Sequence, residues 1–330
     1  IVVPEDLKVD GVGLYSEGAK AYIPFRFLDK RLQNILDFST LVFHNAKFDL
    51  RVLRNHGFDI DKIKFHDTMI MSWLLNENRS HALKDLAGSV LKVDEEKITR
   101  FKNVLPRPVL ETYGMFPEEY DLDLVKWEDQ LGLYCIDDCK YTYKLFNIFN
   151  EKLTEQDLQE SYLKLELPFI RVVADMETRG IAIDTAYLTD IGKQMEQKLV
   201  EFKATVWKNA GREFDINSAK QLSNILYKEK NYTVSDEHRT PKGEPSTNVQ
   251  AMTYLKEKYP DDPLVQSVLA YREIYKLHST YIVGLLEKQR KGIIHPSFRQ
   301  HGTETGRLSC SNPNLQQLPR RSDGFNIRKA

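Results

Sequence analysis

Cysteine, long apolar runs and net charge are all scarce in this chain. The three cysteines, Cys135, Cys139 and Cys310, are too few for a disulfide framework, so a reducing, cytoplasmic compartment is expected. No apolar run approaches the roughly 18 residues that a membrane helix needs, which argues against a membrane partner. The formal net charge is −1, so any surface for a nucleic acid must be a local patch.

Cys135 and Cys139 lie four residues apart on a predicted helix, which is the spacing of half a metal site. A complete site would need a second pair of Cys or His residues nearby, and the sequence offers none. Buried or unreactive thiols are therefore the favoured interpretation of these two residues.

Hydrophobic patterning divides the chain into two parts of different character. The first part, residues 1–155, begins with a predicted hairpin and a buried strand and continues with helices, which indicates a compact α/β domain. The predicted strands are 12–15, 21–24 and 40–43. The predicted helices are one that begins after Asn45 and those at 68–75, 83–91 and 132–150. The first residue is neither an initiator methionine nor the start of a signal peptide, so we expect a longer parent chain.

The second part is mainly helical. A helix at 165–179 ends at Gly180, and a long amphipathic helix runs from Asp184 or Thr185 to Gly211. The predicted elements that follow are a turn-rich segment at 239–246 and a second long helix at 263–287. Two long helices joined by a loop-rich tip predict an arm that reaches over a ligand without enclosing it.

The C-terminal segment 288–330 carries a local excess of positive charge. Its basic residues are Lys288, Arg290, Lys291, Arg299, Arg307, Arg320, Arg321, Arg328 and Lys329. Only Glu304 and Asp323 oppose them, which indicates a polyanionic ligand, most simply a nucleic acid. The Arg, Asn and Gln side chains of this segment suit base edges, and in the minor groove a donor senses pair geometry without reading sequence. Composition alone would favour a polar loop over a solvated basic face.

Two pairs of polar residues have the i, i+4 spacing of one helix face. Asn45 is paired in this way with Asp49, and Tyr134 with Asp138. Hydrolysis of a phosphodiester with two Mg²⁺ ions needs converging carboxylates, because hard cations prefer oxygen ligands. A tyrosine hydroxyl beside the attacking water would orient it. Each pair alone also fits helix capping or a solvated surface, so neither identifies a site by itself.

The order of residues in the C-terminal segment points to a protein family more specifically than its charge does. Residues 303–321 read TxTGRLSxxxPNLQxxPxR, which resembles a signature of family A DNA polymerases, the DNA polymerase I type. The resemblance implies a monomeric enzyme of DNA replication and repair, in a bacterial cell or a phage-infected host. Its implied partners are primer-template DNA and deoxynucleoside triphosphates. It also implies that Arg307 reaches the minor groove at the primer's terminal pair, that Asn314 and Gln316 read nearby pairs, and that Arg321 contacts DNA.

The two helical pairs, in this order and at this separation, resemble the second and third motifs of DEDD-type 3′–5′ exonucleases of the tyrosine subclass. Segments 67–69 and 83–87 also resemble the proofreading domain of DNA polymerase I. The resemblance implies an RNase H-like fold with a mixed sheet and helices, single-stranded 3′ ends as substrate, and Mg²⁺ as cofactor, with Mn²⁺ as the alternative ion. The implied site residues are Asp49 and Asp138 as catalytic metal ligands, Tyr134 as the catalytic group that orients water, and Asn45 as a contact to the DNA strand.

The first motif of that nuclease family, an Asp-x-Glu on the strand before the predicted hairpin, is missing from the sequence. Glu5 and Asp6 stand near the expected place, but adjacent side chains diverge on a strand. The motif was either cut off upstream of Ile1 or lost, and we favour truncation. Asp137 beside Asp138 is no substitute, because neighbours on a helix diverge by about 100°.

The predicted arm resembles the thumb of the same polymerases, which assigns residues 156–290 to a helical thumb and 291–330 to the start of an α+β palm. The implied DNA contacts of the thumb are Lys220, Lys242, Ser246, Arg272 and Lys276. Arg272 and Lys276 are four residues apart and are implied to meet backbone phosphates, contacts that position a duplex without reading its sequence. The catalytic aspartates of the palm would follow Ala330.

We therefore interpret the chain as an internal fragment of a family A DNA polymerase with a 3′–5′ proofreading exonuclease, itself inactive as a polymerase. Two alternatives stay open. One is a stand-alone DEDD-type exonuclease acting on RNA, against which the thumb and the TGRLS segment argue. The other is a non-catalytic duplex-DNA-binding module with a vestigial exonuclease fold, which the missing first motif keeps open. The coding sequence on both sides would separate the three.

Overall fold

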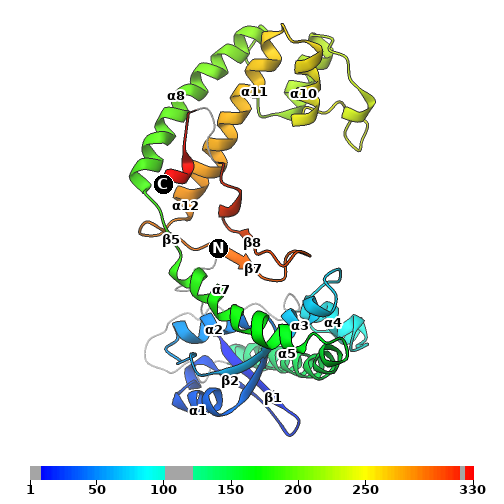
Figure 1. The fold of residues 1–330 in the computed structure, drawn as a ribbon, viewed down its shortest axis with the longest axis vertical. Helices are drawn as coiled ribbons and strands as arrows, with labels where there is room; N and C mark the ends of the chain where they lie inside the picture. Colours follow the sequence, from blue (N-terminus) through cyan, green and yellow to red (C-terminus); the bar gives the residue numbers. More distant parts are fainter. Residues whose placement is uncertain (1–8, 101–121, 320–323) are drawn as a thin grey trace. The chain divides into compact units, whose positions relative to one another are not determined.

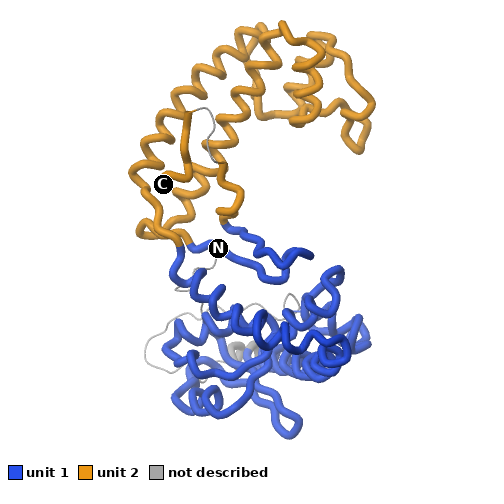
Figure 2. Tube along the Cα trace, viewed as in Figure 1, with its two compact units in different colours: residues 1–180, 295–312 blue, residues 181–294, 313–330 orange. Residues whose placement is uncertain are grey.

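The computed structural model describes residues 9–100, 122–319 and 324–330, so the expectations placed on Glu5, Asp6 and Arg321 lie outside the described residues. The chain divides into two compact units (Figure 2). The first unit is the chain up to Gly180 together with His295–Asn312, and the second is Ile181–Ile294 with Pro313–Ala330. The two units are defined by packing alone. The functional domain boundaries predicted near residues 155 and 290 stay a prediction. No helix of the described residues is long and apolar enough to cross a membrane.

The first three strands of the first unit lie where the sequence predicts strands. Strands β1 (Gly11–Ser16) and β2 (Ala19–Pro24) form an antiparallel hairpin, and the expected buried strand is β3 (Thr40–Phe43). Strand β3 pairs in parallel with β4 (Lys64–Asp67), a strand that the sequence analysis did not predict. A parallel pair needs a crossover between its strands, and helix α2 provides it here.

Helices make up most of the rest of the first unit (Figure 1), which confirms its α/β character. They are α1 (Lys30–Phe38), α2 (Ala46–Asn55), α3 (Thr68–Leu75), α4 (Leu83–Ser89), α5 (Leu122–Glu155), α6 (Gln159–Ser161), a π-helical turn (Tyr162–Glu166) and α7 (Leu167–Arg179). Short 3-10 turns lie at Phe25–Phe27 and Glu95–Lys97. Helix α7 ends at Gly180 with a φ of 68°, which is the predicted stop.

Helix α5 is the longest helix described in the first unit, and it packs against β1 through small side chains. A Cβ atom added to Gly13 would lie 3.0 Å from the Cβ of Cys135 and 3.2 Å from the Sγ of Cys139. The two thiols therefore face a glycine-lined surface and act in packing. None of the three cysteines forms a disulfide.

A small hairpin follows in the chain at 297–311. Strand β7 (Ser297–Arg299) pairs antiparallel with β8 (Ser309–Ser311), and Phe298 stands opposite Cys310. The loop between the strands contains the first four residues of TGRLS, and Ser309 begins β8. This hairpin belongs to the first unit, together with α7 and α2.

The second unit contains the two long helices that the sequence predicts as an arm. Helix α8 (Thr185–Ala210) runs alongside α11 (Pro263–Lys276), which continues through a π-helical segment (Leu277–Val283) into α12 (Gly284–Lys288) (Figure 1). The elements between them are α9 (Ala219–Ser223), a π-helical segment (Asn224–Glu229), a 3-10 turn (Asp236–His238) and α10 (Val249–Lys258). Asp184 caps α8, and Gly211 ends it with a φ of 87°, both as predicted.

The C-terminal segment of the second unit packs onto the base of these helices. Strand β5 (Ile181–Ala182) pairs antiparallel with β6 (Ile293–Ile294), and the backbone N–H of Asp184 donates to the carbonyl of Ala330 at 3.0 Å. Two 3-10 turns, Leu315–Gln317 and Ile327–Lys329, belong to this segment. Phe325 and other apolar side chains of the segment join the core formed by α8 and α12.

Candidate nuclease and DNA-binding sites

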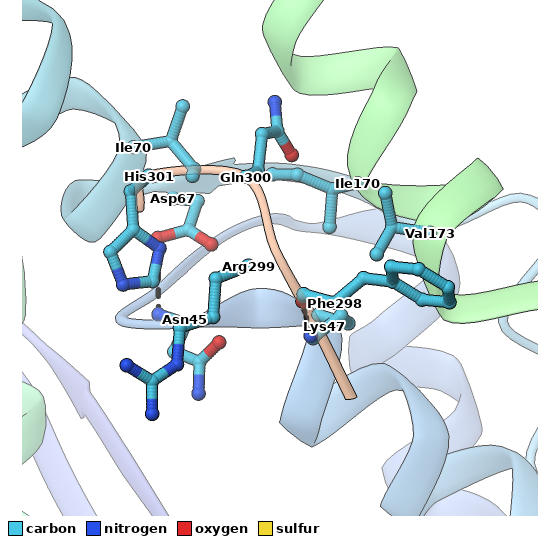
Figure 3. A pocket seen from close by; sticks show the side chains of 10 residues that line it. All are labelled: Asn45, Lys47, Asp67, Ile70, Ile170, Val173, Phe298, Arg299, Gln300 and His301. Atoms are coloured by element: carbon cyan, nitrogen blue, oxygen red, sulfur yellow. Dashed lines mark hydrogen bonds between the residues drawn. The ribbon is translucent and has the colours of Figure 1, made fainter. Parts of the chain in front are cut away.

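The start of helix α2 is held by one buried carboxylate. Asp67, with 2% of its surface exposed, accepts from the backbone N–H of Asn45 at 3.0 Å (Figure 3). It also accepts from the backbone N–H of Ala46 at 2.7 Å. It also caps α3 through the N–H of Met69 at 2.8 Å. Its own backbone N–H donates to the hydroxyl of the buried Tyr162 at 2.9 Å. These bonds stabilise the left-handed conformation of Asn45, whose φ is 72°, and so fix where α2 begins.

Replacing Asp67 by alanine should lower the free energy of unfolding of the first unit by about 2–4 kcal/mol, because three backbone donors lose their acceptor. Asp29→Ala is the matched control. Asp29 also caps a helix, through the N–H of Arg31 at 2.8 Å, but its side chain is exposed and contacts only its own turn. A loss of about 0.5–1 kcal/mol is expected there. Urea-dependent hydrogen exchange would measure both, and equal losses would contradict the bridging role of Asp67.

Helix α5 and helix α4 bring the second predicted pair together with a lysine. Lys84 forms an ion pair with Asp138, and its ammonium lies 4.5 Å from the centre of the Tyr134 ring. Tyr134 donates a hydrogen bond to the carboxylate of Asp138. Burial raises the pKa of Asp138, and the bonds from Lys84 and Tyr134 lower it. Burial and the neighbouring Asp138 charge both raise the pKa of Tyr134, so this hydroxyl stays protonated as a donor.

The charges of Asp49 of α2 and Asp138 of α5 both act on the Cys139 thiol. Burial raises the pKa of this thiol most, and Cys135, Asp138 and Asp49 raise it further. The pKa of Asp49 is raised to about 7, first by burial and then by the charge of Asp67. A cation bound beside Asp49 would favour its ionised form. Both carboxylates thus act on the Cys139 thiol, but neither is among the groups that shift the pKa of the other, and their pairing at a metal stays a prediction.

The donor set for a metal is incomplete in the described part of the chain. Asp49 and Asp138 offer the oxygen donors that Mg²⁺ prefers. No group of three or more His, Cys, Asp or Glu side chains among the described residues is arranged to hold a metal ion. Asp138 already has the Lys84 ammonium as its counter-ion. The described side chains therefore match a metal site in donor type but not in number.

The sequence by itself does not mark Lys84 as a site residue. A signal was present, because Lys84 lies within the segment 83–87 that resembles a proofreading domain, and α4 turns it toward α5. Asp67 was likewise noticed only as part of a resembling segment. The number of bonds that each residue makes to distant parts of the chain becomes visible only in the folded structure.

Arg307 lies in the β7–β8 loop of the first unit, and its side chain is exposed. The hydroxyl of Thr303 donates to the Arg307 carbonyl at 2.7 Å, which closes the loop on itself. Gly306 has a φ of 71°, a conformation that favours glycine, so the Gly-Arg turn read in the sequence has a backbone reason. The loop presents the guanidinium to solvent from a hydrogen-bonded base.

Arg272 and Lys276 share helix α11 but have different surroundings. The Arg272 guanidinium is partly buried and donates to the backbone carbonyl of Thr247. Burial also lowers the pKa of Arg272. Lys276 is exposed. Arg272 therefore joins α11 to the tip segment, and of these two Lys276 is the side chain presented to solvent.

The remaining predicted DNA contacts of the second unit lie on its surface or in its turns. Lys220 in α9 and Lys242 in the tip are exposed. Ser246 is tied into the tip, because its backbone N–H donates to the carbonyl of His238 at 2.9 Å. Asn314 caps the 3-10 turn Leu315–Gln317 through the backbone N–H of Gln316 at 3.1 Å, and the Gln316 side chain is exposed.

Comparison with known families assigns both halves of the chain. Residues 185–330 match the model of DNA polymerase family A, and residues 16–154 match the model of the 3'-5' exonuclease. A nuclease module followed by a polymerase module is the order that the sequence predicts. The C-terminal part of the chain, residues 185–330, belongs to DNA polymerase family A and follows a 3'-5' exonuclease module, which confirms the resemblance drawn from the motifs.

Its relatives are bacterial DNA polymerases I. The chain is 34% identical over 293 residues to DNA polymerase I of Chloroflexus aurantiacus, covering 87% of this chain and 29% of that protein. It is 31% identical over 315 residues to DNA polymerase I of Borreliella burgdorferi, covering 94% of this chain and 32% of that protein. The chain thus spans less than a third of the length of each of these two relatives.

One solved structure has the same fold over most of the chain. It is the "POL domain of Pol1 from M. smegmatis complex with DNA primer-template and dNTP", with a TM-score of 0.72 and 24% sequence identity. The match covers 92% of this chain and 48% of that one. At this identity the likeness establishes the fold alone.

Proposed function

We propose that this chain is part of a DNA polymerase that extends primers and removes mispaired 3′ ends by 3′–5′ hydrolysis. The observation that carries the nuclease assignment is the Tyr134 hydroxyl bonded to the Asp138 carboxylate on α5, with Asp49 on α2 as a second carboxylate whose charge acts on the same Cys139 thiol. A phosphodiester bound beside Asp138 would meet a carboxylate and a hydroxyl donor. Asn45, at the start of α2, would contact the strand that carries the scissile bond.

The finer assignments follow from this proposal. The nuclease module would have an RNase H-like fold, residues 156–290 would be the thumb, and 291–330 the start of the palm. Activity would depend on a divalent metal, Mg²⁺ or Mn²⁺, held by Asp49 and Asp138 together with ligands from outside the described residues. The metal would supply the charge that stabilises the leaving oxygen. Tyr134 would orient the attacking water, and the raised pKa of its hydroxyl suits a donor that does not ionise.

Primer-template DNA is the ligand that the exposed cations of the second unit and of the β7–β8 loop fit best. Lys220, Lys242 and Lys276 offer charge to phosphates, and Arg307, Asn314 and Gln316 offer donors to base edges. A related solved structure is described as a complex with DNA primer-template and dNTP, which supports this choice of ligand. Deoxynucleoside triphosphates would be substrates of the complete enzyme, which we expect to act as a monomer.

The 330-residue chain should bind primer-template DNA weakly and without sequence preference. Its affinity should fall by about 10²–10³-fold between about 50 and about 200 mM salt, because phosphate contacts release counterions. Fluorescence anisotropy would measure this. Lys276→Gln should lower the salt slope by about one, whereas Lys256→Gln, an exposed lysine on α10, should leave it unchanged. Equal slopes for both variants would rule out a duplex path along α11.

The same chain should add no nucleotide to a primer, since the catalytic aspartates of the palm are expected after Ala330. Template-dependent extension by the purified chain would show that the catalytic carboxylates are among these 330 residues.

A duplex-binding module with a vestigial nuclease is the second candidate, and one observation favours it. Lys84 already neutralises Asp138, and the described residues offer no complete metal site. Digestion of single-stranded DNA by the complete polymerase, dependent on Mg²⁺, would eliminate this candidate. The absence of digestion together with normal duplex binding would establish it.

A further inference from the structure

A buried charge cluster in the first unit joins α2 to α7 and to the β7–β8 hairpin. Glu177 of α7 has only 1% of its side chain exposed. Its Oε1 accepts from the Lys47 ammonium at 2.6 Å, and its Oε2 accepts from the Arg51 guanidinium. Both cations come from α2 and are mostly buried, with 17% and 15% of their side chains exposed. One carboxylate thus joins two residues of α2 to α7.

The same cluster completes the outer edge of strand β7. Glu177 Oε1 also accepts from the backbone N–H of Phe298 at 2.6 Å, and the Lys47 ammonium donates to the Phe298 carbonyl. Charged side chains thus occupy the polar edge where a further strand would otherwise pair. The Nδ1 of His295 lies 2.9 Å from the backbone carbonyl oxygen of Glu177 and makes a second tie at the start of the strand.

A second ion pair between the same two helices does not reach the hairpin. Arg54 of α2 bonds Asp175 of α7 at 2.5 Å, and these side chains are 34% and 44% exposed. Docking α2 onto α7 therefore does not require Glu177 alone. What distinguishes Glu177 is its bond to β7, together with a burial that makes loss of either partner costly.

The hairpin and α2 each carry residues of the proposed function. Helix α2 carries Asp49 and starts at Asn45, and the β7–β8 loop carries Arg307. Figure 3 shows Arg299, the last residue of β7, beside Asn45 on the wall of one small pocket. A shift of β7 against α2 would therefore move residues of both reactions.

We propose that Glu177 is a positioning residue for both activities, because with Lys47 it locks the β7–β8 hairpin to the helix that carries Asp49. This inference rests on the proposed function for its catalytic consequence, but not for its structural one. Reacting groups misplaced by about 1 Å lose rate by about 10²-fold, so a lock of this kind matters for chemistry more than for binding.

Hydrogen exchange of the 330-residue chain tests the structural part. Glu177→Gln should raise the exchange rates of the amides at 297–311 by about tenfold or more. Lys47 and Arg51 lose their counter-ion, and the bonds that Glu177 and Lys47 make to Phe298 at the edge of β7 weaken. Asp175→Asn, the matched control on the same helix pair, should leave these rates unchanged. Unchanged hairpin rates in Glu177→Gln, or an equal rise in Asp175→Asn, would overturn the proposal.

A second variant covers the case in which Glu177→Gln does not fold. Lys47→Met keeps the apolar stem and leaves Glu177 paired with Arg51, while it removes the bond to the Phe298 carbonyl. It should raise hairpin exchange in the same direction by a smaller factor. Exchange that stays at the unmodified rate in Lys47→Met would contradict the lock.

Activity of the complete polymerase tests the catalytic part. Glu177→Gln should lower kcat of both 3′ excision and nucleotide addition by about ten- to hundredfold, with changes in KM and in duplex Kd of less than about threefold. Asp175→Asn should lower neither. Loss of only one activity, or a loss confined to KM, would contradict joint positioning. If the unmodified polymerase excises or extends nothing, the proposed function fails. The exchange result still decides whether Glu177 and Lys47 fix the β7–β8 hairpin to α2.

Discussion

Asp49→Ala should abolish 3′–5′ digestion by the complete polymerase and leave primer extension largely intact. Asp49 lies in the first turn of helix α2, and its charge, like that of Asp138, raises the pKa of the Cys139 thiol. Removal of a metal ligand forfeits several kcal/mol of charge stabilisation in the transition state, and about 4 kcal/mol corresponds to about a thousandfold in rate. The measurement is single-turnover digestion of a labelled single strand, with primer extension followed in parallel.

Asp138→Ala should give the same loss, and Asp137→Ala is its matched control. Asp137 and Asp138 are adjacent on α5, so their side chains diverge by about 100° and only one can face the proposed metal site. Lys84 selects Asp138 by its ion pair. Near-normal digestion by Asp49→Ala, or a loss in Asp137→Ala equal to that in Asp138→Ala, would refute the assignment of these carboxylates.

Arg307→Ala should slow nucleotide incorporation by the complete polymerase by about one to three orders of magnitude, or about 1.4–4 kcal/mol. A Watson–Crick pair presents its minor-groove acceptor at a fixed place, whereas a mismatch displaces it. A guanidinium bonded there would align the primer's 3′ end only on correct geometry. Duplex affinity should fall far less, since phosphate contacts dominate it. Arg307→Lys should not rescue the rate, because an ammonium lacks the planar fork.

A double perturbation tests where Arg307 acts. Replacing the primer-terminal purine by its 3-deaza analogue removes the proposed acceptor. It should reproduce the rate loss in the unmodified enzyme and add little to the loss in Arg307→Ala. Fully additive losses would place Arg307 elsewhere, for instance in shaping the loop that Thr303 closes.

The sequence alone determined the elements whose signals are local. Alternation around the turn at 16–18 predicted the β1–β2 hairpin, and apolar steps of three and four residues predicted α8 between Asp184 and Gly211. Such signals suffice because side-chain period, caps and stops all act within a few residues along the chain. The family was also readable from the sequence, since TGRLS and the two i, i+4 pairs are short motifs in a fixed order.

The sequence pattern does not predict strand β4, because its four residues, Lys64–Asp67, show little apolar alternation. It becomes a strand by pairing in parallel with β3, a contact between segments that lie on either side of α2 in the chain. Tertiary contacts commonly override weak local propensity in short strands of this kind.

Only the tertiary structure decided which charges meet. Lys84 lies 54 residues from Asp138 in the sequence, and Lys47 lies 130 residues from Glu177, yet each pair shares a hydrogen bond. Arg272, for which the sequence predicts a phosphate contact, likewise donates to the Thr247 carbonyl 25 residues away. The sequence does not show which charged side chains pair, because pairing depends on which of them folding buries next to one another. A charge that folding removes from water must find its counter-ion wherever the chain brings one.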